Sequence, residues 1–204
     1  MRTKREVPIY QMKLTLRGVK PPIWRRVQMR GNSTLATLHQ AIQLLMGWYD
    51  GHLHEFEANG VCYGAPVPAA GPFWGEPVKA ESKARLQQVL PEEKCRLTYT
   101  YDFGDNWLVD VVLERILPPD DAKRYPLCLA GRRAGPKDDS GGPWGYMELL
   151  EIVADPKHPD HEEMKEWLGE GWDAEAFSVE EANEILSVSH PSGRRGGWVL
   201  SDLE

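Results

Sequence analysis

Cysteine is scarce in this chain of 204 residues, and the three cysteines, Cys62, Cys95 and Cys128, lie far apart without a CxxC pair. This spacing argues against a disulfide framework and against a cysteine zinc site. No apolar run approaches the ~20 residues of a membrane helix, and the basic start of the chain lacks the apolar region of a signal peptide. We therefore expect a soluble, cytoplasmic protein without a membrane partner.

Several catalytic signatures are absent as well. The chain has no Gly-x-Ser-x-Gly nucleophile turn and no Gly-x-x-x-x-Gly-Lys phosphate loop. The triplet Asp102-Phe103-Gly104 matches the metal-binding triplet of protein kinases, but the glycine-rich loop and the His-Arg-Asp loop of kinases are missing. Serine hydrolases with that turn, P-loop nucleotide hydrolases and kinases are therefore set aside.

The net charge of −7 is unevenly distributed along the chain. Residues 1 to 30 contain nine lysines or arginines and one glutamate, whereas residues 137 to 184 contain fifteen acidic residues and three lysines. The basic end is either a nucleic-acid contact surface or the solvated face of a hairpin. We favour the second interpretation, because phosphate binding needs several cations on one face and the net charge opposes it. The candidate nucleic-acid contacts are Arg17, Lys20, Arg25, Arg26 and Arg30.

Apolar and polar residues alternate with a period of two in several stretches, which predicts antiparallel hairpins. The first hairpin comprises Tyr10 to Leu16 and residues 23 to 29. The second comprises residues 97 to 101 and residues 107 to 113. A shorter hairpin is predicted around the tight-turn dipeptide Asn59-Gly60.

One helix is predicted early in the chain. Apolar residues recur at helical spacing from Leu35 to Met46, between a Ser33 or Thr34 cap and Gly47. His39 lies beside the apolar stripe of this helix, and we interpret it as a packing histidine rather than a ligand.

Beyond residue 118 the pattern changes to loops and helices. Helices are predicted around residues 146 to 153 and 164 to 168, and the capping box Ser178-x-x-Glu181 opens a third helix. The residues of the third helix that we expect to face inward are Ala182, Ile185 and Leu186.

This order of elements is typical of the α+β class, here a mainly antiparallel sheet with one early helix packed on it and a helical C-terminal region. Residues 1–186 are expected to form a single domain, and residues 187–204 a loose C-terminal tail. Residues 65 to 77, with four prolines and two glycines, are expected to form a long exposed loop.

Groups that can bind a metal, a proton or a ligand lie in two stretches, residues 52 to 56 and residues 101 to 107. On a strand that rises ~3.3 Å per residue, His52 and His54 would point to one face about 6.6 Å apart, a separation that two ligands of one metal can span. We expect the hairpins to bring both stretches together around a concave surface. The proposed groove residues are His52, His54, Tyr101, Asp102, Asp105 and Trp107.

Three interpretations of these residues remain open. They could line a groove for a ligand, or hold a divalent cation such as Zn, Mn or Fe if the loops converge. They could also be purely architectural, with aspartates that bond turn amides. Gly104 is expected to adopt a positive φ within the turn. The candidate metal ligands are His52, His54, Asp102, Asp105 and Asp139.

Several motifs in one order resemble the plasmid pRiA4b ORF-3-like family over residues 8 to 186. The motifs are Tyr10 to Leu16, Lys20-Pro21-Pro22-Ile23-Trp24-Arg25-Arg26, Thr34-Leu35 to His39, Met46-Gly47-Trp48, His52-Leu53-His54-Glu55-Phe56, Tyr101-Asp102-Phe103-Gly104-Asp105-x-Trp107, Tyr125-Pro126-x-Cys128 and Asp138-Asp139-x-Gly141-Gly142-Pro143-x-Gly145-Tyr146. The resemblance implies a compact α+β domain found on plasmids and chromosomes of bacteria and archaea, with members sometimes labelled transposon-resolvase-like. It implies no particular biochemical activity.

The chain departs from the family pattern in three places. Many members continue the central motif with Asp-Trp-Glu-His, where this chain has Asn106-Trp107-Leu108-Val109. Many also carry cysteines at the positions of Gly135 and Ser140. If those members hold a metal with cysteine or histidine, this chain lacks part of that site.

The function that we prefer on this basis is a binding or interaction module, associated with plasmid or mobile-element biology. The alternative is a metal-dependent hydrolase that uses a His-x-His pair with an aspartate. The third is weak, sequence-insensitive nucleic-acid binding through the basic hairpin, which salt would abolish. The partner considered is thus a protein or a nucleic acid, and the cofactor considered is a divalent metal.

Overall fold

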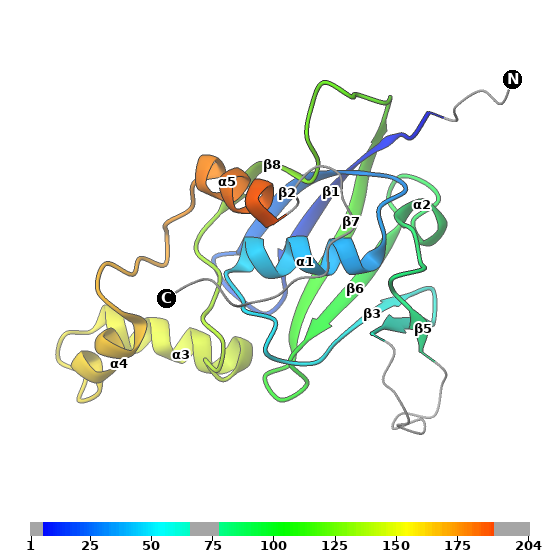
Figure 1. Ribbon diagram of the computed structural model, residues 1–204. Coiled ribbons are helices and arrows are strands. Elements are labelled where there is room, and N and C mark those ends of the chain that lie inside the picture. The colour runs from blue at the N-terminus through cyan, green and yellow to red at the C-terminus, as the bar shows by residue number, and fades with distance from the viewer. Residues whose placement is uncertain (1–5, 66–77, 190–204) are drawn as a thin grey trace, which may run out of the picture.

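The computed structural model describes residues 6–65 and 78–189, which form a single sheet with helices packed on it (Figure 1). The strands are β1 (Ile9–Leu16), β2 (Trp24–Arg30), β3 (His54–Ala58), β4 (Val61–Gly64), β5 (Lys79–Ala80), β6 (Arg96–Tyr101), β7 (Trp107–Leu117) and β8 (Leu127–Arg132). The helices are α1 (Leu35–Met46), α2 (Leu86–Val89), α3 (Gly142–Ala154), α4 (His161–Leu168) and α5 (Val179–Ser189). The strand order is β5-β4-β3-β6-β7-β1-β2-β8, with β4 and β5 the parallel pair among the described strands. The predicted α+β class is confirmed.

The first hairpin and α1 build the centre of the core. Alternate residues of β1 are buried and those between them are half-buried, as the period of two predicts. The helix α1 lies across the sheet and buries Leu35, Leu38, Ile42 and Leu45 (Figure 1). Each fully buried leucine or isoleucine contributes roughly 1.5–3 kcal/mol to the free energy of unfolding. The contact between α1 and the sheet is therefore a main source of stability.

Both ends of α1 lie where the sequence predicts them. The Thr34 hydroxyl oxygen accepts a hydrogen bond from the Thr37 N–H at 3.2 Å, which caps the first turn. At the other end, Gly47 adopts a φ of 76°, a conformation that glycine reaches without steric cost. The chain therefore leaves the helix abruptly and returns to the sheet at β3.

The central hairpin also forms as predicted, with Tyr101 of β6 opposite Trp107 of β7. The left-handed positions of its turn are Asp102, with a φ of 53°, and Asn106, with a φ of 55°. Gly104 has no positive φ, so our expectation for this glycine is wrong. Aspartate and asparagine tolerate the left-handed region better than other residues with a side chain. The turn therefore does not need a positive φ at Gly104.

Three elements have no counterpart in the sequence analysis, namely β5, α2 and β8. Tertiary contact holds β8 in place. The Asn183 side chain of α5 accepts a hydrogen bond from the Cys128 N–H at 2.8 Å and donates one to the Cys128 carbonyl at 2.9 Å. The sequence of β8 has no periodic pattern that predicts this contact, because Asn183 lies on a helix far along the chain from Cys128.

The C-terminal helices match the predicted ones with one correction. The Ser178 hydroxyl accepts a hydrogen bond from the Glu181 N–H at 3.2 Å at the start of α5. Ala182 and Leu186 are buried as predicted, but Ile185 is 46% exposed, because α5 contacts the core through a narrow stripe. The helix continues to Ser189, into the segment expected to be a tail. The rest of that tail and almost all of the predicted loop at 65 to 77 lie outside the described residues.

None of the helices in the described part of the chain is both long and apolar enough to cross a membrane.

Candidate functional site

Three segments meet at the end of the sheet where β6 turns into β7. They are residues 47–53, 102–106 and 137–141, and we call the place where they meet the three-loop site. The Asp102 N–H donates a hydrogen bond to the Leu53 carbonyl at 2.9 Å. The Asp105 carboxylate accepts one from the Gly141 N–H at 3.1 Å. These hydrogen bonds hold the second segment between the other two.

His52 occupies the centre of the three-loop site. Its Nδ1 lies 3.6 Å from Oδ2 of Asp102, and its Nε2 lies 3.5 Å from Oδ1 of Asp139. The ring meets the ring of Tyr101 edge-on, with 5.7 Å between centroids. The two carboxylates therefore flank opposite edges of the imidazole, and both distances exceed those of hydrogen bonds.

The floor of the site contains two buried polar atoms, the Tyr101 hydroxyl and Oδ1 of Asp138. Burial raises the pKa of Tyr101 to about 12, and the nearby Asp138 carboxylate adds to this effect. Burial likewise raises the pKa of Asp138. Trp48 stacks on the Tyr101 ring with 4.7 Å between centroids and donates to the Pro136 carbonyl at 3.1 Å. The floor is thus rigid, and its polar atoms lie beneath the surface.

The backbone is left-handed at carboxylates in and beside this site. Asp50, Asp102 and Asp139 have φ values of 56°, 53° and 61°. A left-handed conformation costs energy for any residue with a side chain, and such residues concentrate at functional sites.

Four large apolar side chains that belong to the three segments or to the adjoining start of α3 are exposed. Tyr49 and Leu53 belong to the first segment and are 86% and 68% exposed. Phe103 of the second segment is 44% exposed, and Trp144, in the first turn of α3 after the third segment, is 90% exposed. We call these four residues the rim.

The structure distributes the predicted groove residues over different roles. Asp105 bonds the Gly141 amide and so positions the third segment. Trp107 and Tyr101 are fully buried beneath the site rather than lining a groove. His52 precedes β3, which begins at His54, so the expectation that both histidines lie on one strand is wrong. His52 therefore belongs to the three-loop site, and His54 does not.

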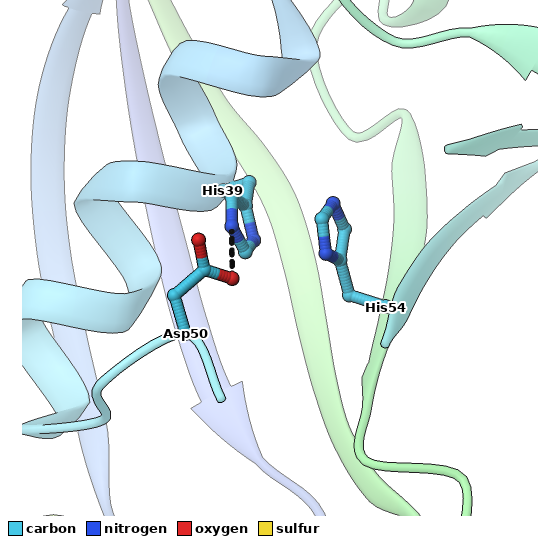
Figure 2. A group of neighbouring side chains, drawn as sticks. All are labelled: His39, Asp50 and His54. Carbon is cyan, nitrogen blue, oxygen red and sulfur yellow. Dashed lines mark ion pairs between the residues drawn. The ribbon is translucent and has the colours of Figure 1, made fainter. Parts of the chain in front are cut away.

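His54 lies in a second cluster, between α1 and the start of β3 (Figure 2). Its ring stacks on His39 of α1 with 3.6 Å between centroids and 10° between planes. Its Nε2 lies 2.9 Å from Oε2 of the buried Glu81. Nε2 of His39 lies 3.0 Å from Oδ1 of Asp50.

His39 is buried, as expected of a packing histidine, but it is also fully engaged in polar contacts. Its Nδ1 forms a hydrogen bond of 2.7 Å with the Tyr99 hydroxyl, which accepts another from the Gln43 amide at 2.8 Å. Burial, together with the neighbouring His54, lowers the pKa of His39 to about 4. The imidazole of His39 is therefore uncharged at neutral pH.

We expect metal-free protein to lose about 2 kcal/mol of unfolding free energy through His39 as the pH falls from about 7 to about 5. In this range the unfolded chain takes up a proton at the ordinary histidine pKa of about 6.5, whereas the folded chain does not until about 4, so acid favours unfolding. The groups near the His39 ring are His54, Asp50 and Tyr99, and the charge of Glu81 acts on it as well. Urea unfolding at several pH values should show a smaller loss for His39→Gln, and equal losses would contradict the prediction.

Most cations of the basic hairpin are already engaged within the protein. Arg17 pairs with Asp110, and Arg26 pairs with Glu114 at 2.7 Å. Arg30, a third predicted nucleic-acid contact, pairs with Asp121 at 2.9 Å.

Arg25, in contrast to Arg26, points into the core, as neighbours on a strand must point to opposite faces. Its guanidinium lies over the ring of Phe177, 4.2 Å from the centroid. Lys20 is exposed. The five candidate cations thus do not converge on one surface.

Asp50 and Glu81 were not among the predicted site residues, because nothing in the local pattern distinguishes them from the other acidic residues of the chain. Asp138 was named only as part of a glycine-rich loop. Its Oδ2 accepts a hydrogen bond from the Tyr49 N–H at 3.3 Å, across 89 positions of the chain. The signal that could have found it is the pair Asp138-Asp139 before Gly141-Gly142, where a helix start is expected.

Comparison with known proteins shows similarity to a family model, to a protein sequence and to a solved structure. The family model described as plasmid pRiA4b ORF-3-like protein matches residues 8–181. A protein of Sinorhizobium fredii, "Uncharacterized protein y4hQ", is 35% identical over 180 residues, which cover 87% of this chain and 90% of that protein. The crystal structure of a protein of unknown function from Methanosarcina mazei, MM3350, is similar with a TM-score of 0.76 at 42% identity, covering 86% of this chain and 98% of that one.

Proposed function

This chain belongs to the plasmid pRiA4b ORF-3-like family, and we propose that it is a binding module whose three-loop site holds a positively charged side chain of a partner protein. The observation that carries this proposal is the exposure of the four rim residues around the carboxylates of the site. Water solvates large apolar side chains poorly, so several of them gathered on a surface are typical of a contact site.

The charge of the site supports a cationic ligand. Asp102, Asp138 and Asp139 contribute carboxylates, and within the described residues no lysine or arginine pairs with any of them. An arginine of a partner could supply the missing charge, because a guanidinium bonds a carboxylate through two parallel hydrogen bonds. It also stacks favourably on aromatic rings such as those of the rim.

A groove beside the site supports recognition of a peptide segment rather than a free amino acid. It begins at Asp139, runs between α3 and α4, and has a volume of about 320 Å³. Its apolar lining residues are Leu149, Ile152, Met164 and Trp167. Side chains that flank the bound arginine could therefore pack into the groove, which adds affinity without further charges.

Fluorescent peptides of equal length, one rich in arginine and one rich in glutamate, test the proposal by anisotropy. We expect the arginine peptide alone to bind, with an affinity that decreases as salt increases. Asp102→Asn and Trp144→Ala should each weaken binding about tenfold, which corresponds to about 1.4 kcal/mol. Asparagine tolerates the positive φ at residue 102, so the first variant should unfold within about 0.5 kcal/mol of the wild type.

Matched controls lie on α5, away from the site. Glu184→Gln removes one exposed carboxylate, and Val188→Ala removes an exposed apolar side chain. Neither should change the affinity for the arginine peptide. Binding that weakens equally in the controls and in the site variants would reflect net charge alone and would refute a specific site.

The second candidate function is a metal-dependent hydrolase at the same place. It is favoured by the distance between one potential ligand atom each of His52, Asp102 and Asp139, which all lie within 4.8 Å of one another. The geometry favours it less than the first candidate, because the two carboxylates face different nitrogens of His52 and a metal binds only one of them. Loss of stoichiometric metal in His52→Ala would support the hydrolase.

Three broader expectations remain predictions. A role in plasmid or mobile-element biology rests on the family resemblance alone. Residues 1–186 are proposed to fold as one domain, and the protein is proposed to act in the cytoplasm. Limited proteolysis tests the domain boundary, since cleavage should remove only residues after α5.

A further inference from the structure

We propose that His39, His54 and Asp50 form a binding site for a divalent cation of the Zn²⁺ type, separate from the group His52, Asp102 and Asp139 of the three-loop site. One potential ligand atom from each of the three residues lies within 4.8 Å of the other two. Figure 2 shows the two rings and the carboxylate gathered between α1 and the start of β3. Two imidazoles with one carboxylate are a donor set that Zn²⁺ and related transition metals prefer.

The environment of His54 engages Nε2 and leaves Nδ1 for the cation. Its Nε2 is engaged with the Glu81 carboxylate at 2.9 Å. Nδ1, the other nitrogen, lies on the side of the ring that faces Asp50 in Figure 2. A histidine that ligates a metal commonly donates its second N–H to a carboxylate, which orients the ring and raises its basicity. Glu81 is 6% exposed and supplies this contact.

In His39, as in His54, one ring nitrogen is engaged by a neighbouring side chain and the other faces the proposed cation site. Its Nδ1 is hydrogen-bonded to the Tyr99 hydroxyl, whose oxygen also accepts from Gln43. This leaves Nε2, 3.0 Å from Oδ1 of Asp50, for the cation.

Asp50 provides the third ligand and the route of entry. Its side chain is 60% exposed, so a hydrated cation can reach the carboxylate from solvent. Its N–H donates to the Gln43 side chain at 2.9 Å, which holds the residue against α1. The exposure also leaves room for water as a fourth ligand, as in zinc sites with three protein ligands.

The stacked rings add a specific requirement. A metal lies in the plane of each imidazole that ligates it, and two parallel rings 3.6 Å apart cannot share one ion. One ring must therefore turn out of the stack when the cation binds. His54 is the ring to turn, because Glu81 holds it through one nitrogen, whereas Tyr99 and Asp50 contact both nitrogens of His39. Metal binding should thus be accompanied by a change at His54.

The experiment uses the full chain, purified without a polyhistidine tag and stripped with a chelator. Titration with Co²⁺ should give visible bands of a four- or five-coordinate ion, and Zn²⁺ should abolish them at one equivalent per chain. Asp50→Asn and His54→Ala should each weaken Zn²⁺ binding at least about tenfold. The ring resonances of His54 should shift on addition of Zn²⁺, and those of His158 should not.

Two controls separate this site from other histidines. His158→Ala removes a histidine outside both clusters, and His52→Ala removes the histidine of the three-loop site. Both should retain one equivalent of metal. Metal that is lost in His52→Ala and kept in Asp50→Asn would overturn the proposal, as would the absence of binding to the wild type. Asp50→Asn alters an exposed side chain, so it remains informative even if His54→Ala fails to fold.

Discussion

Replacement of Gly135 by alanine is expected to lower the free energy of unfolding by about 3 kcal/mol, at the upper end of overpacking effects. A Cβ atom at this position would lie 1.9 Å from the carbonyl oxygen of Met46, and its other nearest neighbours are also main-chain atoms of Met46. No side chain can rotate away, so the backbone must shift. Because Met46 ends α1 just before residues 47–53, the shift would also pull the third segment of the three-loop site away from the first.

The matched control for this change is Gly51→Ala, within the first segment. No atom lies within 4 Å of its added Cβ and its φ is not positive, so we expect a change within about 0.5 kcal/mol. Chemical unfolding monitored by tryptophan fluorescence measures both variants. Equal stability of Gly135→Ala and the wild type would show that the loop does not approach Met46 so closely.

Replacement of Arg25 by methionine is also expected to cost about 3 kcal/mol of unfolding free energy, because buried carbonyls lose their donors. Arg25 is 1% exposed and donates to the carbonyls of Leu45, Trp24 and Arg132, each at 2.9 Å. The Leu45 carbonyl lies in the last turn of α1, where carbonyl groups have no hydrogen-bond donor within the helix. Burial lowers the pKa of Arg25 to about 10, so the guanidinium stays charged at neutral pH and suits this helix end.

Arg26→Met is the control on the same strand. Arg26 faces the opposite side of the sheet and forms a partly exposed pair with Glu114, so its loss should cost less than about 1 kcal/mol. A thermal scan of both variants beside a DNA-binding assay separates the roles of the two arginines. If Arg25→Met were as stable as Arg26→Met but lost DNA affinity, Arg25 would be a nucleic-acid contact rather than a structural residue.

Patterns within a few residues determined much of the fold. The helical spacing from Leu35 to Met46, with Thr34 before it and Gly47 after it, located α1, because caps and apolar stripes act over one or two turns. Alternation located the two main hairpins, and Asn59-Gly60 located the tight turn between β3 and β4. The same reasoning directed attention to His52 and Asp102, which the structure brings together.

Local sequence patterns did not predict the site correctly where a strand begins one or two residues later than expected, or where a side chain contacts a residue far along the chain. The start of β3 at His54 places His52 outside the strand, so the two histidines enter different clusters. Nothing near Gly104 in the sequence shows that Asp102 and Asn106 take the left-handed positions of the turn instead.

The sequence by itself determined the main hairpins, α1 and the C-terminal helices, and it pointed to one end of the sheet as the candidate site, since period and capping depend on neighbouring residues. Only the tertiary structure decided which side chains meet there. Tyr49 bonds Asp138 across 89 positions, and Arg25 bonds Arg132 across 107. Such partners are selected by packing of the whole chain, because a buried polar group must find a partner wherever the fold supplies one. The pairing of His39 with His54 and Asp50 arises in this way, from a helix, a loop and a strand that only the folded sheet brings together.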